Sequence, residues 1–394
     1  MNKQKRISII LSVLFLLPWG MQFLMENFLS IYIHNLPYGT DKLIGQIQSL
    51  GAVITMLSQF FWTRLADKTG KTDKILAITL ILLSVFSIPF LNLNISKTML
   101  FISIILFYSC YMCHQPLIDA IASKEHEKTK FSFGFFRSFA SLGYGLMGIV
   151  FVLLPSDNNN IFFVYVIILA FSSAIITLLL PKSENSVSVQ AIKKSKNKIK
   201  YSKEFYMYLV YTFILFVCSS TINTFLPVYY TSTDGLGGNL NTYSLILSIG
   251  TFVEWLLMLL FGKILKKPNF KYMFMIIVVV TMLRCGLNFL AQSYHLATIS
   301  VFLVGVYSAL LWASSTPYIK TVVPMENMAS AQGLWIIASY GFGKFAGSYI
   351  GGIITENFGY KNLFLIVFSV ATVLLLLCPV FFKKKPLHNI AGQN

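Results

Sequence analysis

The sequence predicts an all-α membrane protein whose twelve transmembrane helices form two pseudo-symmetric six-helix bundles. Hydrophobic residues make up 56% of the 394 residues and charged residues only 11%. Soluble domains carry about 25% charged residues. The apolar residues occur in runs of about 20, the length that crosses the hydrocarbon core of a bilayer. Finally, the basic residues gather in alternate loops between these runs.

Each apolar run is long enough for one helix, and continuous runs exclude the alternating strands of a membrane β-barrel. The first run is too long for a signal-peptide core and carries Glu26 without a small-residue cleavage site, so we expect it to stay in the mature chain. We place the runs at about residues 7–33, 43–63, 75–92, 98–122, 132–154, 161–180, 205–230, 241–265, 271–291, 297–320, 329–355 and 362–382.

The net charge of +17 reflects membrane topology. Most lysines and arginines fall before the first run, after every second run and after the last, which is the pattern of the positive-inside rule. The pattern predicts a multi-pass protein of the cell membrane with both termini in the cytoplasm. Basic loops also attract anionic lipid headgroups. We therefore expect a lipid bilayer around the chain and no nucleic-acid partner.

A lysine-rich polar stretch divides the spans six and six. Its low hydrophobicity and like charge predict a mobile cytoplasmic linker. We assign residues 1–180 to the N-terminal bundle, 181–204 to the linker, 205–382 to the C-terminal bundle and 383–394 to a cytoplasmic tail.

The two halves also repeat a short motif. Ala-Ser-Leu-Gly-Tyr-Gly at 140–145 recurs as Ala-Ser-Tyr-Gly-Phe-Gly at 338–343. A repeat of about half the chain length is typical of transporters that bind their solute between two related bundles.

Two motifs that suggest other chemistry lie in unsuitable places. Cys110 to His114 matches a haem-attachment pattern but falls inside a predicted span, where haem is not attached. His114 and Asp119 resemble an acyltransferase signature that Pro116 interrupts. No phosphate-binding loop is present. We expect no cofactor and no metal, and a membrane-embedded enzyme using His114 and Asp119 is a remote alternative.

The loop after the second span resembles the hallmark of the major facilitator superfamily, Gly-x-Leu-Ala-Asp-Arg/Lys-x-Gly-Arg/Lys. Asp67, Lys68, Gly70 and Lys71 fit this motif, and Thr63 stands in place of its first glycine. We expect Asp67 to cap a helix terminus and to pair with basic groups. The resemblance implies a conformational latch on the cytoplasmic face.

Further segments resemble the subgroup of phenylpropionate permease, nucleoside/proton symporters and lactose permease. They are residues 133–144, Glu254 with Arg284 thirty positions later, and residues 332–352. The resemblance implies two six-helix bundles that rock about a central cavity, which opens to each side in turn.

Six charged residues fall within the predicted spans: Glu26, Asp119, Arg137, Glu254, Arg284 and Lys344. A charge in a bilayer costs roughly 2.5–3.5 kcal/mol on insertion scales unless it is paired or wetted, and it marks a functional site by default. We expect these acids and bases to neutralise one another, and a purely structural ion pair is the alternative for each.

Asp119 and Arg137 lie on either side of a short turn, so two antiparallel helices can bring them together. In lactose permease an acid and an arginine at this separation bind sugar hydroxyls. The resemblance therefore implies that Asp119 and Arg137 contact the substrate. Tyr144 lies on the same helix face as Arg137 and stands where that relative has a sugar-stacking tryptophan.

Glu254 and Arg284 are expected on neighbouring helices of the C-terminal bundle. An apolar surrounding favours the neutral form of a carboxyl group and a nearby cation favours the charged form. A movement of Arg284 would then let Glu254 take up and release a proton. Glu26 is predicted either to line the cavity or to lie at a helix end. Lys344 either neutralises an acid, meets an anionic substrate or reaches to the interface.

The sequence thus predicts a monomeric secondary transporter that carries a sugar, nucleoside or aromatic acid with protons by alternating access. A proton-antiport exporter of drugs or sugars is an alternative, because these motifs do not fix the direction of transport. A sensor or scaffold that transports nothing would tolerate neutral residues at Asp119, Arg137 and Glu254.

Overall fold

Helices account for the regular structure of the described chain, and no strand occurs in it. The computed structural model describes residues 3–153, 160–180, 201–264, 269–324 and 327–382. Eleven helical segments in these ranges are long and apolar enough to cross a membrane. The last, Ser330–Phe381, is broken at Gly359, whose φ of 78° and ψ of 169° are not helical. The described chain thereby accounts for the twelve predicted crossings.

The N-terminal half contains six crossings. The fourth is divided, because α4 ends at Tyr111 and α5 begins at His114. Pro116 lies in the first turn of α5, where its missing N–H is not needed. The elements are α1 (Lys3–His34), α2 (Asp41–Thr69), α3 (Thr72–Ser87), η1 (Ile88–Leu91), α4 (Lys97–Tyr111), α5 (His114–Glu125), η2 (His126–Lys128), α6 (Phe133–Leu153) and α7 (Ile161–Leu178).

The C-terminal half contains the other six crossings, and its fifth crossing includes a π-helical segment, η4. The elements are α8 (Lys203–Thr231), α9 (Leu240–Ile264), α10 (Phe270–Leu290), α11 (Tyr294–Val322), α12 (Met328–Trp335), η4 (Ile336–Phe342) and α13 (Gly343–Phe381). Residues 181–200 of the predicted linker and the predicted tail, 383–394, lie outside the described residues. The helix α8 already begins at Lys203, within the last two residues assigned to the linker.

Local signals in the sequence explain several helix ends. Thr40 caps α2 by accepting a hydrogen bond from the Leu43 amide at 3.1 Å. Ser202 caps α8 in the same way through the Phe205 amide at 3.3 Å. Hydroxyl side chains at these positions satisfy amides that the first helical turn leaves free. Gly70 ends α2 with a φ of 67°, a conformation that glycine adopts without steric cost.

The two bundles meet at one end of the molecule, where α2 packs along α13 and α6 packs along α9. A Cβ atom on Gly45 would lie 2.6 Å from the Ser348 carbonyl oxygen, so α2 and α13 touch backbone to backbone. The Lys42 amide donates to the Glu356 carboxylate at 3.1 Å, which ties the same helices together. Small residues permit such close helix crossings.

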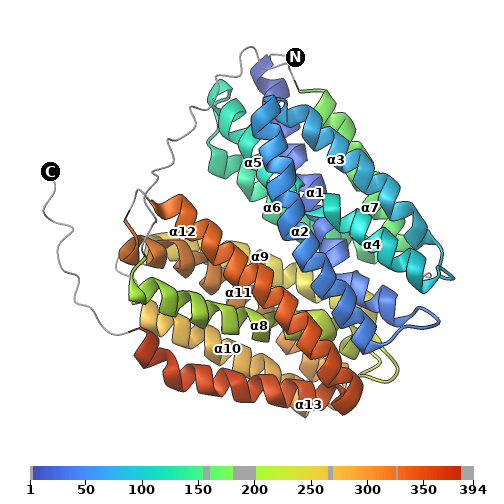
Figure 1. The fold of residues 1–394 in the computed structure, drawn as a ribbon, viewed down its shortest axis with the longest axis vertical. Coiled ribbons are helices and arrows are strands. Elements are labelled where there is room, and N and C mark those ends of the chain that lie inside the picture. Colours follow the sequence, from blue (N-terminus) through green and yellow to red (C-terminus); the bar gives the residue numbers. More distant parts are fainter. Residues whose placement is uncertain (1–2, 154–159, 181–200, 265–268, 325–326, 383–394) are drawn as a thin grey trace, which may run out of the picture.

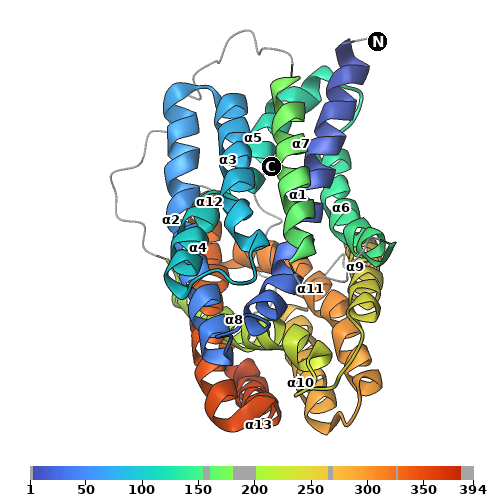
Figure 2. The same ribbon diagram turned by 90° about the vertical axis from the view of Figure 1, so that its right-hand side faces the viewer.

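The bundles spread apart away from this closed end. Figure 1 shows the N-terminal bundle, with α1 and α2, diverging from the C-terminal bundle, with α8 and α12, toward the end at which α1 begins. Figure 2 shows α3 and α7 side by side on the outside of the N-terminal bundle. Outer helices expose apolar side chains, such as Ile168 and Phe171 on α7, as a lipid-facing surface requires.

We predict that Gly45→Ala weakens the closed end, because the added methyl group meets the backbone of α13. Cross-linking of a Lys42→Cys, Glu356→Cys pair with a short bifunctional thiol reagent measures closure, since the five native cysteines are buried. The yield is expected to fall severalfold. Gly286→Ala is the matched control, because its Cβ would lie 3.9 Å from Phe368, an ordinary contact. Equal yields for Gly45→Ala and this control would contradict the prediction.

Candidate functional site

Glu26 is a carboxylate at which both bundles meet. On its own helix, Gln22 Nε2 donates to Glu26 Oε1 at 3.0 Å. The Tyr144 hydroxyl on α6 donates to Oε2 at 3.2 Å. The Tyr340 hydroxyl on η4, in the other bundle, donates to Oε1 at 3.3 Å. Glu26 therefore lines the interior between the bundles, and the alternative of a residue at a helix end is wrong.

Further polar groups surround this carboxylate. Asn27 Nδ2 donates to the Tyr144 hydroxyl at 3.2 Å. Lys344 Nζ lies 6.0 Å from the centre of the Tyr340 ring, one helical turn further along. Glu254 on α9 lies within electrostatic range of the Glu26 carboxyl group and the Tyr144 phenol. A polar cluster thus spans the two bundles at mid-helix.

Asp119 and Arg137 come together as predicted, on α5 and α6. Asp119 Oδ1 and Arg137 Nη1 are 4.0 Å apart, and the two side chains are 34% and 35% exposed. Neither atom has a hydrogen-bond partner within the described ranges. This distance exceeds a direct hydrogen bond, so the pair is open and retains unused donor and acceptor capacity.

Aromatic rings of α1 hold Arg137 in place. Its guanidinium carbon lies 4.7 Å from the centre of the Trp19 ring and 5.9 Å from that of Phe15. Such contacts attract a cation to the ring face. The His114 ring meets Trp19 edge-on at 5.2 Å, and His114 Nδ1 lies 2.8 Å from the Tyr111 carbonyl oxygen. His114 is thereby buried behind Trp19, and no contact joins it to Asp119 among the described residues.

The open pair and the Glu26 cluster occupy two levels of the same interior. α1 and α6 pack along one another, and the side chains at Trp19 and Glu26, like those at Arg137 and Tyr144, are seven residues apart. Two helical turns of this kind span about 10 Å. The separation suits a small solute that touches both levels.

Arg284 does not pair with Glu254, which corrects the prediction. α9 and α10 do not pack along one another in the described chain, and Arg284 instead points into its own bundle. There Nε donates to the Ser300 carbonyl oxygen at 3.2 Å and Nη2 donates to Asn223 Oδ1 at 2.9 Å. The expected mutual neutralisation of the six charges therefore holds only for Asp119 with Arg137, among the contacts that the structure describes.

The comparisons with known proteins match this architecture. The model of the MFS_1-like family matches residues 7–366. The chain belongs to this family. It is thus a membrane transporter of the major facilitator superfamily, and the fold and family predictions are confirmed.

Individual relatives span nearly the whole transporter. YwbF of Bacillus subtilis strain 168, an uncharacterized transporter, is 25% identical over 344 residues, which is 85% of this chain and 83% of YwbF. Maltose permease of Geobacillus stearothermophilus is 23% identical over 369 residues, covering 93% and 91%. The crystal structure of a mutant of the nucleoside transporter NupG superposes with a TM-score of 0.83 at 20% identity, covering 97% of this chain and 100% of that one.

The superfamily's loop motif lies at the spread end of the transporter. Asp67 and Lys68 are exposed in the last turn of α2, and Lys71 follows Gly70. Gly70 rather than Asp67 caps this helix end, which corrects the prediction that Asp67 is a cap. Asp67 forms no ion pair with any residue in the described ranges. At this end of α2 the described parts of the two bundles are apart (Figure 1).

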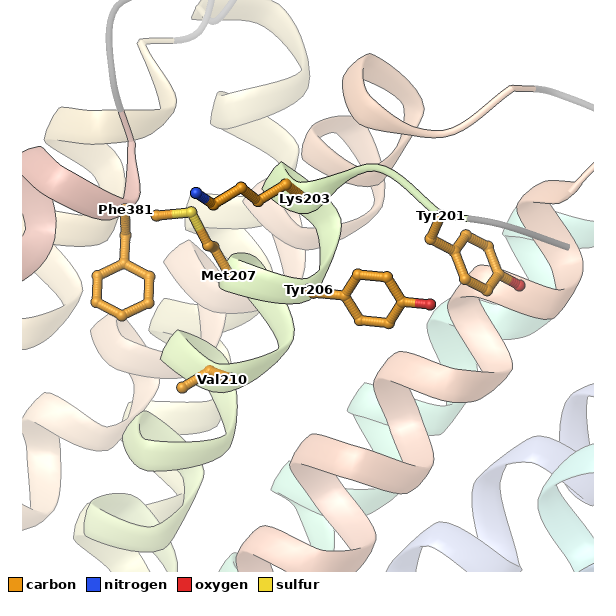
Figure 3. Close-up of a pocket in the computed structure, with 6 residues that line it drawn as sticks. All are labelled: Tyr201, Lys203, Tyr206, Met207, Val210 and Phe381. Carbon is orange, nitrogen blue, oxygen red and sulfur yellow. The ribbon is translucent and has the colours of Figure 1, made fainter.

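A hollow on the outer surface does not belong to this interior. It has a volume of about 450 Å³ and lies at the start of α8 beside the end of α13. Figure 3 shows Lys203 and Met207 extending toward Phe381, and Tyr206 and Tyr201 extending in the opposite direction. Its lining is mostly apolar, so it offers a polar solute few hydrogen-bonding groups.

Sequence reasoning missed Tyr340 and Asn223. Tyr340 stands in the repeated motif, but its counterpart in the first half is Leu142, and the counterpart of Tyr144 is Phe342. The π-helical geometry of η4 spaces side chains differently around the axis than the regular helix α6 does. For Asn223, the available signal was a polar amide side chain within the mostly apolar sequence of α8.

We predict that Asp119→Asn has little effect on stability, because the pair is partly exposed and 4.0 Å apart. The expected loss is about 1 kcal/mol or less in the free energy of unfolding. Thr212→Val is the comparison, since Thr212 and Ser339 are fully buried and their hydroxyl oxygens are 2.8 Å apart. Leaving Ser339 unpaired is expected to cost about 1–3 kcal/mol.

Parallel thermal unfolding scans of the purified variants in detergent compare the two losses. If Asp119→Asn destabilised the protein as much as Thr212→Val, the Asp119–Arg137 pair would be a structural element rather than a binding site.

Proposed function

We propose that this transporter carries a small polar organic solute together with protons by alternating access. The solute belongs to the sugar, nucleoside or aromatic-acid class. The observation that carries this proposal is the Asp119–Arg137 pair, whose facing atoms are buried and lack hydrogen-bond partners among the described residues, although both side chains are partly exposed.

The gap between Asp119 and Arg137 suits a hydroxyl group. A hydroxyl donates one hydrogen bond and accepts others, whereas a carboxylate only accepts and a guanidinium only donates. An oxygen placed between atoms 4.0 Å apart can donate to Asp119 and accept from Arg137. Trp19 and Phe15 hold the guanidinium in position from behind. Maltose and nucleosides, which the names of two relatives mention, both carry such hydroxyl groups.

We assign the coupled proton to Glu254. Its carboxyl group receives no hydrogen bond from the described residues, whereas Glu26 receives three. Two like charges in an apolar interior disfavour one another. The titratable groups around the two acids include the phenols of Tyr108, Tyr111, Tyr144 and Tyr340 and the ammonium group of Lys344. Because Glu26 and Glu254 belong to opposite bundles, a rocking movement changes their separation and with it the proton affinity of Glu254.

The predictions of the topology and of the cytoplasmic latch fit the same alternating-access cycle. We place both termini in the cytoplasm, so that the spread end opens inward and the end closed by Gly45 faces outward. When the bundles rock, Asp67, Lys68, Gly70 and Lys71 come near the C-terminal bundle and act as the latch. Arg284 contacts a carbonyl and an amide oxygen rather than an acid, so we assign it no part in carrying the proton.

The proposal predicts uphill uptake in proteoliposomes that carry an imposed pH gradient. A panel of sugars, nucleosides and aromatic acids is screened for accumulation that a protonophore abolishes. Asp119→Asn and Arg137→Gln are each expected to lower the initial rate at least tenfold, because each removes one side of the hydroxyl site. Lys97→Gln, at the exposed start of α4, is the control and should transport normally.

If no solute of the panel moved in response to the pH gradient, the symport proposal would be refuted. Accumulation driven only by the reversed gradient would assign the protein to export instead.

Glu254→Gln is expected to abolish accumulation driven by the pH gradient and to retain exchange of labelled for unlabelled solute, because the neutral amide mimics the protonated acid. Both activities are measured on the same vesicles. Accumulation at the wild-type level by Glu254→Gln would show that the proton binds elsewhere.

A further inference from the structure

Arg284 is a fully buried guanidinium whose outer edge is incompletely used. The residue is 1% exposed. Its Nε is fixed by the Ser300 carbonyl oxygen on α11, and its Nη2 by the Asn223 amide oxygen on α8. Its Nη1 is buried and has no acceptor within the described part of the chain. The fork formed by Nη1 and Nη2 therefore holds a single neutral acceptor.

The positive charge of Arg284 has no negative partner among the described residues. The ionisable groups that interact with it are Cys285, Tyr307 and Tyr243. Thiols and phenols are neutral at pH 7. Arginine does not lose its proton in proteins. An uncompensated buried charge is costly, and a positive one calls for an anion.

Asn223 separates this charge from the interior between the bundles. It is exposed, although its neighbours Ile222 and Thr224 on the central helix α8 are buried. Its amide oxygen reaches inward to Arg284, and α8 also packs on α1 and α2 of the other bundle, so we place its exposed part at the opening between the bundles. A charged acceptor forms a shorter and stronger hydrogen bond with a guanidinium than an amide does, and often a bidentate one. An anion can therefore displace the Asn223 oxygen and engage Nη1 and Nη2 together.

We propose that Arg284, behind Asn223, is an anion-binding subsite of the C-terminal bundle. Its ligand is a carboxylate or phosphate group of the transported solute, or a free inorganic anion such as chloride. The proposed function requires no charge on the solute, and the subsite extends it to an acidic group. Binding at the subsite does not depend on proton coupling. It lies on the bundle opposite to the Asp119–Arg137 pair, so one solute can offer a hydroxyl group to one bundle and an acidic group to the other.

The test is anion-dependent thermal stability of the purified full-length protein in detergent, which needs no transport. Chloride or inorganic phosphate replaces the bulky HEPES anion at constant ionic strength, and glucuronate is compared with glucose. Binding to the native state raises the unfolding midpoint with ligand concentration. We expect the unfolding midpoint to rise by a few °C and to level off at high anion concentration. A response to chloride or phosphate identifies a free anion, and a response to glucuronate alone identifies an acidic solute group.

Variants assign the response to this site. Arg284→Gln is expected to abolish it, and Lys97→Gln, which removes an exposed positive charge outside both proposed sites, is expected to retain it. If Arg284→Gln does not fold, Asn223→Asp tests whether the response comes from this subsite, because the variant places a carboxylate of the chain itself against Nη2. This variant is expected to unfold at a higher temperature than the wild type in the HEPES buffer and to ignore added anions. Asn362→Asp, at an exposed position, is the matched control and should respond like the wild type.

The absence of any response of the wild type to chloride, phosphate and glucuronate would overturn the proposal. A full anion response in Asn223→Asp would overturn it as well. Neither result would bear on pH-driven uptake, so failure of the subsite and failure of the symport proposal are distinguishable.

Discussion

Every charge within a membrane needs a partner or water, and this requirement governs the structure. A carboxylate or guanidinium surrounded by lipid is unfavourable, and the chain resolves the problem differently at each position. Asp119 and Arg137 face one another at 4.0 Å, and Glu26 accepts hydrogen bonds from neutral donors of both bundles. Arg284 is held by an amide and a carbonyl oxygen. A chain that needed only stability would not carry these groups in its spans.

The architecture keeps these groups between two separately packed bundles. Close backbone contact at Gly45 and Ser348 holds the bundles at one end, and they spread toward the other (Figure 1). The hydrogen bond from Tyr340 to Glu26 crosses between the bundles near their middle. Any rocking that opens the closed end must change this contact. A movement of this kind would therefore also alter the surroundings of the acids.

Much of this arrangement could be predicted from the sequence, because the signals are local. Continuous apolar runs define the helices. The short turn between Asp119 and Arg137 brings that pair together. The seven-residue interval from Arg137 to Tyr144 places both on one helix face, although the meeting of Tyr144 with Glu26 depends on how α1 and α6 pack.

The errors arose where the answer depends on packing between helices. Glu254 and Arg284 lie on consecutive helices, yet α9 packs on α6 and α11 rather than along α10. Arg284 therefore finds Asn223 and Ser300 instead of a carboxylate. Tyr340 could not be found by comparing the two halves, because the π-helical segment η4 replaces the regular helix of its counterpart.

The central claim is that the intramembrane charges border a watery opening between the bundles. Ser141 lies one turn beyond Arg137 on the same face of α6 and is partly exposed, and Ser141→Cys leaves every charge in place. Its reaction with a membrane-impermeant thiol reagent, added to one or the other face of sealed vesicles, is the most direct measurement. The account predicts reaction from the side that bears residues 126–132. No reaction from either side would place these charges in a dry or lipid-facing setting and contradict it.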